Sequence, residues 1–169
     1  MEIKLAIMED VTLLYEMYAN LIAHMKEQQL EIWDDIYPCC MFEEDVAKQR
    51  LYVLKQEHEV VAAFALCEYS DGAAHVNWKF KEGKALYLDR LGVNVKFTRR
   101  GIGRMMLKHA ISIAEEKGVD VLRLFVVDAN LPAIQLYEQY GFIQAAGIYD
   151  EAIDDNLTLH EYGYEILCK

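Results

Sequence analysis

The stretch LGVNVKFTRRGIGRMMLK, residues 91–108, joins the end of a predicted strand, a turn with two glycines and the start of a predicted helix. Together with Arg90 it holds six of the chain's 17 basic residues and no acidic residue, although the formal net charge is -11. A strand, a glycine turn and a helix start direct backbone N–H groups and the positive helix end at one point, as in phosphate sites. The stretch therefore predicts an anion site.

The turn at 98–104 matches neither common nucleotide motif. The Walker pattern GxxxxGK[ST] is absent, and the dinucleotide pattern GxGxxG fails at Met106. Gly101 and Gly103 allow the backbone to approach a ligand closely, and Ile102 is expected to anchor the helix on the sheet. The turn alone is equally compatible with a tight connection whose arginines are solvated.

Length and composition predict a single folded domain over residues 1–169. Hydrophobic residues make up 54% of the chain, which is too high for disorder. No apolar run approaches the roughly 20 residues that span a bilayer. The N-terminus is interrupted by charge, so we expect no signal peptide. The four cysteines show no CxxC spacing, which favours a reduced, cytoplasmic location.

The acidic net charge indicates which classes of ligand or partner the protein can bind. It argues against nucleic acid and against anionic membranes, and it fits a cationic small substrate. The five histidines show no HExxH or other paired ligand spacing, so we expect no metal.

Hydrophobic periodicity and cap residues predict an α/β (α+β) fold. Asn130 is a good N-cap, Pro132 suits a first helical turn, and Gly118 and Gly141 suit helix ends. Because hairpins alternate with βαβ units, we expect a central mixed sheet of six to seven strands flanked by about four helices. An acidic loop containing 150–155 should join the last two strands. The expected strands are 2–7, 51–56, 60–69, 85–95, 121–127, 142–149 and 158–167, and the expected helices are about 11–25, 42–50, 102–117 and 131–140.

The region from about residue 85 to 142 resembles the GNAT superfamily of acyl-CoA-dependent N-acyltransferases. One motif is the turn at 98–103, and the other is N-x-x-A-x-x-L-Y-x-x-x-G-F from Asn130 to Phe142. The family's phosphate loop reads [Gln/Arg]-x-x-Gly-x-[Gly/Ala]. Both glycine positions match, whereas Thr98 takes the first place. The departure is modest because the loop acts mainly through backbone N–H groups.

The resemblance implies that acetyl-CoA is the co-substrate. The strand residues Leu91, Gly92 and Val93 would splay at a bulge and pair with the pantetheine arm, and an N–H at or near Val93 would polarise the thioester carbonyl. Asn130 would touch the coenzyme near its pantetheine, although it also reads as a plain N-cap. The coenzyme pyrophosphate would bind the turn and the helix start, at Arg99, Arg100, Gly101, Ile102, Gly103 and Arg104.

The resemblance also implies catalytic roles. Tyr137 would lie near the thiol and protonate the leaving thiolate, because a phenol stays protonated until a strong base develops. The alternative for Tyr137 is core packing. Asp89 lies on the central strand in phase with Leu91 and is the candidate base, directly or through water. The alternatives are an ion pair of Asp89 with an arginine, and Glu68 as the base.

The family's acceptor side is formed by the least regular segments, here 21–45, 70–84 and 148–158. Aromatic rings and carboxylates suit a cationic amine. The main candidates in these segments are Trp33, Asp34, Tyr37 and Trp78, and further members are Glu31, Asp35, Asp71, Phe80, Asp154 and Asp155.

These observations predict an N-acetyltransferase that moves an acetyl group from acetyl-CoA to a primary amine of a small molecule or peptide. Attack is expected to be direct, in a ternary complex, and a homodimer is the default assembly in the superfamily. One alternative is a GNAT-like module that binds acyl-CoA without turnover and has a regulatory role. The other is a domain whose glycine turn binds no cofactor.

Overall fold

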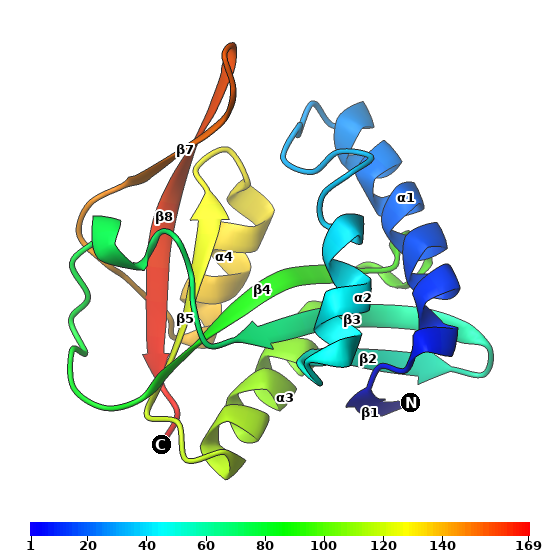
Figure 1. The fold of residues 1–169 in the computed structure, drawn as a ribbon, viewed down its shortest axis with the longest axis horizontal. Coiled ribbons are helices and arrows are strands. Elements are labelled where there is room, and N and C mark those ends of the chain that lie inside the picture. Colours follow the sequence, from blue (N-terminus) through cyan, green and yellow to red (C-terminus); the bar gives the residue numbers. More distant parts are fainter. The chain divides into compact units, whose positions relative to one another are not determined.

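A computed structural model describes residues 1–169 and shows a mixed α/β fold (Figure 1). The pairing of β4 with β5 is parallel, and the pairings of β1 with β2, β2 with β3, and β5, β6 and β7 with β8 are antiparallel. The helices are α1 Val11–Glu27, α2 Phe42–Ala47, α3 Ile102–Glu116 and α4 Leu131–Tyr140. The strands are β1 Glu2–Leu5, β2 Leu51–Gln56, β3 Glu59–Cys67, β4 Ala85–Val93, β5 Val121–Val127, β6 Ile143–Gln144, β7 Tyr149–Asp154 and β8 Leu157–Leu167.

The chain forms two compact units, which are described separately. The first unit contains Met1–Leu66 and Arg90–Met106, and the second contains Cys67–Asp89 and Leu107–Lys169. Both β4 and α3 therefore begin in one unit and end in the other. None of the helices combines the length and the apolar character that crossing a bilayer demands.

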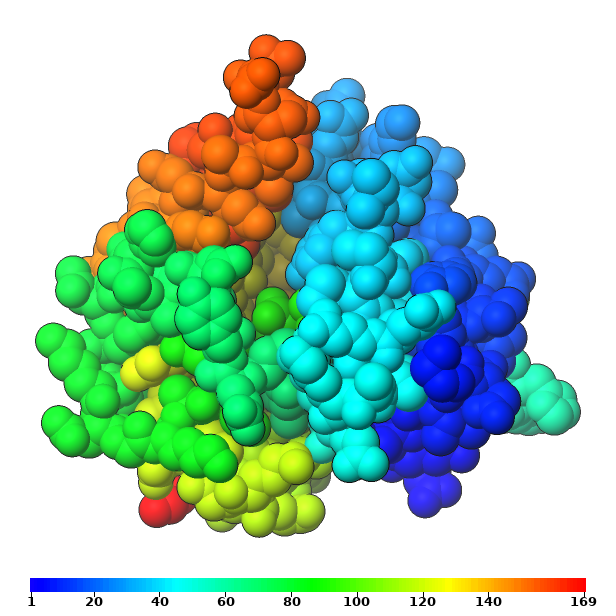
Figure 2. Space-filling model, in the orientation of Figure 1, coloured from blue at the N-terminus to red at the C-terminus, as the bar shows by residue number.

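The first unit is built on β1, β2 and β3, which α1 and α2 cover. The side chains of α1 and α2 lie next to one another on the face seen in Figure 2. Strands β2 and β3 are almost continuously apolar and buried, as expected for strands that have no solvated face. Tyr18 of α1 and Phe42 of α2 are both fully buried, and their ring centroids lie 4.8 Å apart. This aromatic contact fixes α2 against α1.

The second unit is built on β5 and β8, with β4 beside β5 and with β6 and β7 beside β8. Successive side chains of a strand point to opposite faces. Tyr164 of β8 contacts Tyr137 of α4, so α4 covers one face. Phe125 of β5 contacts Trp78, so the segment between β3 and β4 covers the other face (Figure 1).

That segment, predicted as a polar loop at 70–84, is held in place by hydrogen bonds to a buried carboxylate. Glu165 is fully buried, and its carboxylate accepts hydrogen bonds from the backbone N–H groups of Lys79 (2.7 Å) and Phe80 (3.0 Å). Arg123 donates to the carbonyl oxygen of Phe80 at 2.7 Å, and its guanidinium lies 4.5 Å from the Trp78 ring centroid. The segment is therefore an ordered strap over the sheet.

The C-terminal region differs from the sequence prediction. The predicted strand 142–149 is reduced to the two residues of β6, and Gly147 has φ +97°. The predicted acidic loop is wrong, because Asp150, Glu151 and Asp154 lie in β7, which pairs with β8. The fold therefore has eight strands. The short linker Asp155–Asn156 replaces the loop, and Asp154 accepts a hydrogen bond from the N–H of Asn156 at 2.7 Å.

The strap predicts a large stability cost for Glu165→Ala. The change removes a fully buried carboxylate and leaves the N–H groups of Lys79 and Phe80 without their acceptor, which should lower the free energy of unfolding by about 3 kcal/mol. Thermal denaturation should then show a Tm lowered by about 6–12 °C. Glu116→Ala, at an exposed position of α3, is the control and should leave the Tm nearly unchanged. Equal Tm values for the two variants would contradict the anchoring role of Glu165.

Candidate functional site

The end of β4 carries a conformational irregularity. The β4–β5 ladder runs from Ala85 to Leu88, and Arg90 then adopts φ +55°. Positive φ costs a non-glycine residue energy, so it is retained only where the surroundings enforce it. The residue precedes Leu91, Gly92 and Val93, the predicted pantetheine-binding stretch, and it bends the strand at that point.

Gly92 is required because of a close neighbour. A Cβ atom added there would lie 2.8 Å from the ring and hydroxyl of Tyr18 on α1. The Tyr18 hydroxyl donates hydrogen bonds to the carbonyl oxygens of Arg90 and, at 3.4 Å, of Ala63. The ring thus packs directly on the backbone of this stretch, and only glycine leaves room for it.

The predicted phosphate loop leads into α3 through two left-handed residues. Arg99 has φ +61° and Gly101 has φ +74°, and α3 begins at Ile102. The first N–H groups of a helix have no acceptor within the helix, so those of 102–104 are available to an anion. A Cβ added to Gly101 would meet no atom within 4 Å, so the turn is open on that side.

The flanking residues explain the departure at Thr98. Its hydroxyl donates to the carbonyl oxygen of Val95 at 3.0 Å and closes the 3-10 turn Val95–Phe97. Arg100 lies over the Phe97 ring, 5.3 Å from its centroid, and Ile102 is buried as predicted. The hydroxyl at 98 therefore shapes the backbone that leads into the loop.

Two positive charges of the basic stretch are paired with carboxylates from other parts of the first unit. The guanidinium of Arg90 is buried against Asp45, and Lys96 pairs with Glu59 at 2.6 Å. Arg99 and Arg100 lie exposed at the turn. An anionic ligand would therefore meet the loop arginines and the start of α3, whereas Arg90 and Lys96 serve the fold.

In the second unit, α4 is capped as the sequence predicts. The side chain of Asn130 accepts a hydrogen bond from the N–H of Ala133 at 3.4 Å, Pro132 lies in the first turn, and Gly141 ends the helix with φ +105°. Asn130 is half-buried. The N-cap role is established, and a role towards a coenzyme stays a prediction.

Tyr137 is buried on α4 beside two other rings. Its ring centroid lies 5.8 Å from that of Phe142 and 6.5 Å from that of Tyr164. Burial, and to a lesser degree the charge of Asp89, raises the pKa of Tyr137 well above the usual phenol value. The hydroxyl therefore remains protonated at any physiological pH, as a proton donor must.

Three carboxylates, each on a different strand, influence one another in the second unit. Glu161 of β8 is hydrogen-bonded to Glu151 of β7 and also experiences the charge of Asp89 on β4. Burial and these two neighbours raise the pKa of Glu161 to about 9. One of its oxygens is buried without a hydrogen-bond partner. Glu161 is absent from the residues predicted from sequence, although it alternates with Gly163 and Glu165 along β8.

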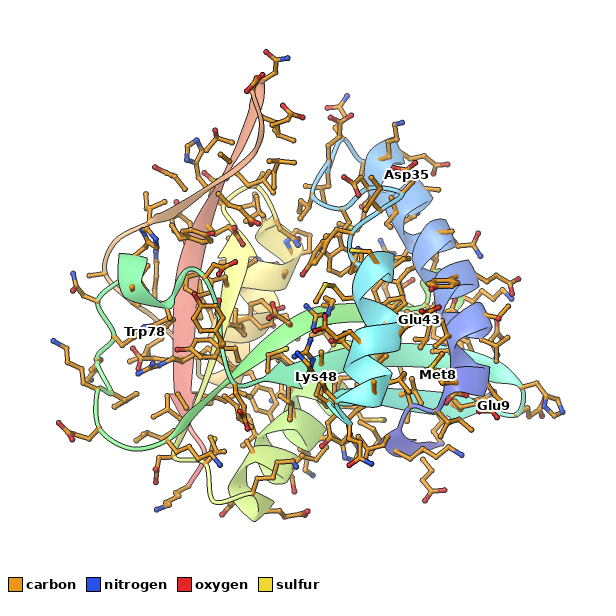
Figure 3. The ribbon with its side chains drawn as sticks, viewed as in Figure 1. Met8, Glu9, Asp35, Glu43, Lys48 and Trp78 are labelled. Atoms are coloured by element: carbon orange, nitrogen blue, oxygen red, sulfur yellow. The ribbon has the colours of Figure 1, made fainter.

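The predicted acceptor residues of the first unit cluster after α1. The carboxylate of Asp34 accepts hydrogen bonds from the N–H groups of Ile36 (2.9 Å) and Tyr37 (2.7 Å). The ring of Trp33 lies 5.6 Å from that of Tyr18. The hydroxyl of Tyr37 accepts a hydrogen bond of 3.5 Å from Arg90. Asp35 belongs to the same segment and is exposed (Figure 3).

The remaining candidates lie in the second unit. Trp78 (Figure 3) belongs to the strap and is buried, and its indole N–H donates to the carbonyl oxygen of Ala73 at 3.0 Å. Its ring sits over Gly163, where an added Cβ would lie 2.9 Å away. The ring is thus committed to packing. Glu68, the alternative base, is exposed just after β3.

Comparison with known proteins gives a family match over most of the chain. Residues 14–142 match the acetyltransferase (GNAT) family. A 58-residue stretch, 34% of the chain, is 47% identical to the [ribosomal protein bS18]-alanine N-acetyltransferase of Salmonella typhimurium, covering 39% of that protein. A 75-residue stretch, 44% of the chain, is 31% identical to the thialysine N-epsilon-acetyltransferase of Bos taurus and covers 44% of it. The chain thus spans less than half the length of these relatives.

The fold is shared with solved structures over nearly the whole chain. The crystal structure of the ribosomal-protein-S18-alanine N-acetyltransferase from Escherichia coli superposes with a TM-score of 0.72 at 20% identity. The match covers 99% of this chain and 93% of that one. This likeness concerns the fold alone.

The buried carboxyl of Glu161 predicts a pH dependence of stability. Its pKa is about 9 in the folded chain against an ordinary 4.5, so the folded state binds more protons between these values, and stability falls as pH rises from 4.5 to 9. Glu161→Gln, whose amide can donate to Glu151, should therefore raise stability at pH 8 by on the order of 2 kcal/mol, allowing for partial exposure. At pH 4 the gain should vanish.

Thermal unfolding of both proteins from pH 4 to pH 9 checks this expectation. Glu116→Gln, at an exposed helix position, is the control and should follow the wild type. A Glu161→Gln curve parallel to that of the wild type at every pH would show that Glu161 is ionised in the folded chain.

Proposed function

The chain belongs to the acetyltransferase (GNAT) family, and on that premise we propose that it transfers an acetyl group from acetyl-CoA to a primary amine. The observation that carries the proposal is the open, left-handed turn at Arg99 and Gly101 that leads into α3. It supplies backbone donors, a helix N-terminus and exposed arginines, which are what a pyrophosphate requires.

The coenzyme is proposed to bind two stretches of the first unit. Its pyrophosphate would accept hydrogen bonds from the N–H groups at 101–104, with Arg99, Arg100 and Arg104 as counter-charges. Its pantetheine arm would pair with the backbone of Leu91–Val93, as an added strand does. An N–H in that stretch, at or near Val93, would donate to the thioester oxygen, whose negative charge grows during attack. Asn130 is proposed to touch the pantetheine.

Direct attack by the amine requires one proton donor and one proton acceptor. We assign the donor role to Tyr137, whose burial keeps the phenol protonated until the thiolate leaves. We assign the acceptor role to Asp89, directly or through water, because its charge already acts on Tyr137 within the second unit. The amine nitrogen bonds to the acetyl carbon as the C–S bond breaks, so no acyl-enzyme forms.

The acceptor is proposed to be a cationic primary amine of a small molecule or a peptide. The two relatives described above are both named for an amine acceptor, an alanine of ribosomal protein bS18 in one and the ε-nitrogen of thialysine in the other. In this chain, Trp33, Asp34 and Tyr37 offer two rings and a carboxylate in one short segment, which suits an ammonium group. Trp78 would contribute only through the strap that it holds.

Acetyl-CoA is expected to stabilise the protein. At a concentration about 100 times its Kd, a ligand of the folded state adds about 2.7 kcal/mol, which corresponds to a Tm raised by about 5–10 °C for a chain of this size. Differential scanning fluorimetry with acetyl-CoA, and with ATP as a control nucleotide, measures the effect. A folded protein whose Tm is the same with and without acetyl-CoA would contradict the proposed function.

Tyr137→Phe is expected to lower kcat by about 100-fold with little change in the KM for acetyl-CoA, because it removes only the proton donor. Thiol release during a screen of primary amines measures the rate. Tyr140→Phe makes the same chemical change on the same helix and should retain activity. A protein that binds acetyl-CoA but shows no turnover with any amine would instead be an acyl-CoA-binding module.

A further inference from the structure

The strained residue Arg90 is held from its side chain by one carboxylate. Asp45 of α2 is fully buried and accepts two hydrogen bonds from the Arg90 guanidinium, one from Nε at 2.9 Å and one from Nη2 at 2.8 Å. Arg50 donates a third bond to the same carboxylate at 2.7 Å. Such a two-pronged arrangement fixes direction as well as distance.

The backbone of the same stretch is held from the other side. The hydroxyl of Tyr18 donates to the carbonyl oxygen of Arg90, and its ring packs on Gly92. Further along, the N–H of Asn94 donates to the carbonyl oxygen of Val61 at 2.8 Å, and its side chain donates to that of Val60 at 2.8 Å. The residues 91–93 are therefore clamped at both ends, and the left-handed Arg90 sets their direction.

We propose that Asp45 is a positioning residue: through Arg90 it holds Leu91–Val93 in the conformation that binds the pantetheine arm of the coenzyme. The inference rests on the proposed function. Asp45 itself touches neither the coenzyme nor the acceptor. Without the guanidinium–carboxylate contact, residue 90 returns to the ordinary extended region that non-glycine residues prefer, and the N–H and C=O groups that follow turn away from the arm.

The role differs from that of an ordinary buried ion pair. The first unit contains a second buried carboxylate, Asp10, which pairs with Lys55 at 2.7 Å and accepts from the N–H of Ile7 at 3.0 Å. That pair lies at the start of α1, and its hydrogen bonds join Asp10 to Ile7 and Lys55. Asp10→Asn is therefore a matched control for the loss of a buried charge.

The first experiment compares two ligands by isothermal titration calorimetry. Acetyl-CoA has the pantetheine arm, whereas 3′-phosphoadenosine 5′-diphosphate has the phosphates without the arm. Asp45→Asn should weaken acetyl-CoA binding about tenfold, the order of magnitude associated with one strained residue. It should leave the affinity for the shorter ligand within about twofold. Asp10→Asn should change neither affinity.

Asp45→Asn leaves a buried guanidinium without its counter-charge, and this alone is expected to destabilise the fold. A pair of double variants that also remove the guanidinium therefore separates the effect on binding from the effect on stability. Asp45→Asn/Arg90→Asn and Asp45→Asn/Arg90→Ala both remove the two charges. They differ in that asparagine adopts positive φ far more readily than alanine. The asparagine variant should therefore bind acetyl-CoA several-fold more tightly than the alanine variant.

The outcomes distinguish failure of the positioning role of Asp45 from failure of the proposed function. Tighter binding by the asparagine variant, with equal affinity of both for the shorter ligand, supports the positioning role. Equal acetyl-CoA affinity in the two folded double variants overturns it, and so does an equal loss for both ligands, which indicates general destabilisation. If the wild type binds neither ligand, the proposed function fails and the inference fails with it.

Discussion

A fully buried and charged carboxylate needs hydrogen-bond donors, and this constraint organises both units of the chain through Asp45 and Glu165. Asp45 accepts hydrogen bonds from Arg90 and Arg50, and so it holds the side chain of the residue at which the strand turns irregular in the first unit. Glu165 is satisfied by two backbone N–H groups, and so it fixes the strap in the second unit. In each case an irregular segment is held by one charge on a regular element, because leaving that charge unpaired costs more than ordering the segment.

Local sequence signals predicted the elements whose ends are fixed by neighbouring residues. Asn130 and Gly141 bound α4 as expected, and the glycine turn leads into α3. β7 was not predicted because its acidic residues are typical of a solvated loop. Only the pairing with β8 makes this segment a strand. Strand formation depends on a partner, which periodicity in one segment does not reveal.

The candidate site likewise contains residues that local sequence signals predict and residues that only tertiary contacts reveal. The turn at 98–104, Gly92 and Tyr137 were proposed from motifs and from the family resemblance, since each lies within or next to a short recognisable run of the chain. Asp45 was not, because its partner Arg90 is 45 positions away. Trp78 packs on Gly163, which is even more remote in sequence. Tertiary contacts of this kind decide which polar and aromatic residues remain available for ligands, and composition alone leaves the choice open.

The contact of Tyr18 with Gly92 has a consequence for the evolution of the chain. The ring occupies the space into which any larger side chain at 92 would have to grow. The residues at the two positions are therefore expected to change together. A lineage that gains a side chain at 92 must also replace Tyr18 by a smaller residue, or the strand is displaced. Substitutions at the two sites should be inherited together, and a chimera that exchanges only one of them should be selected against.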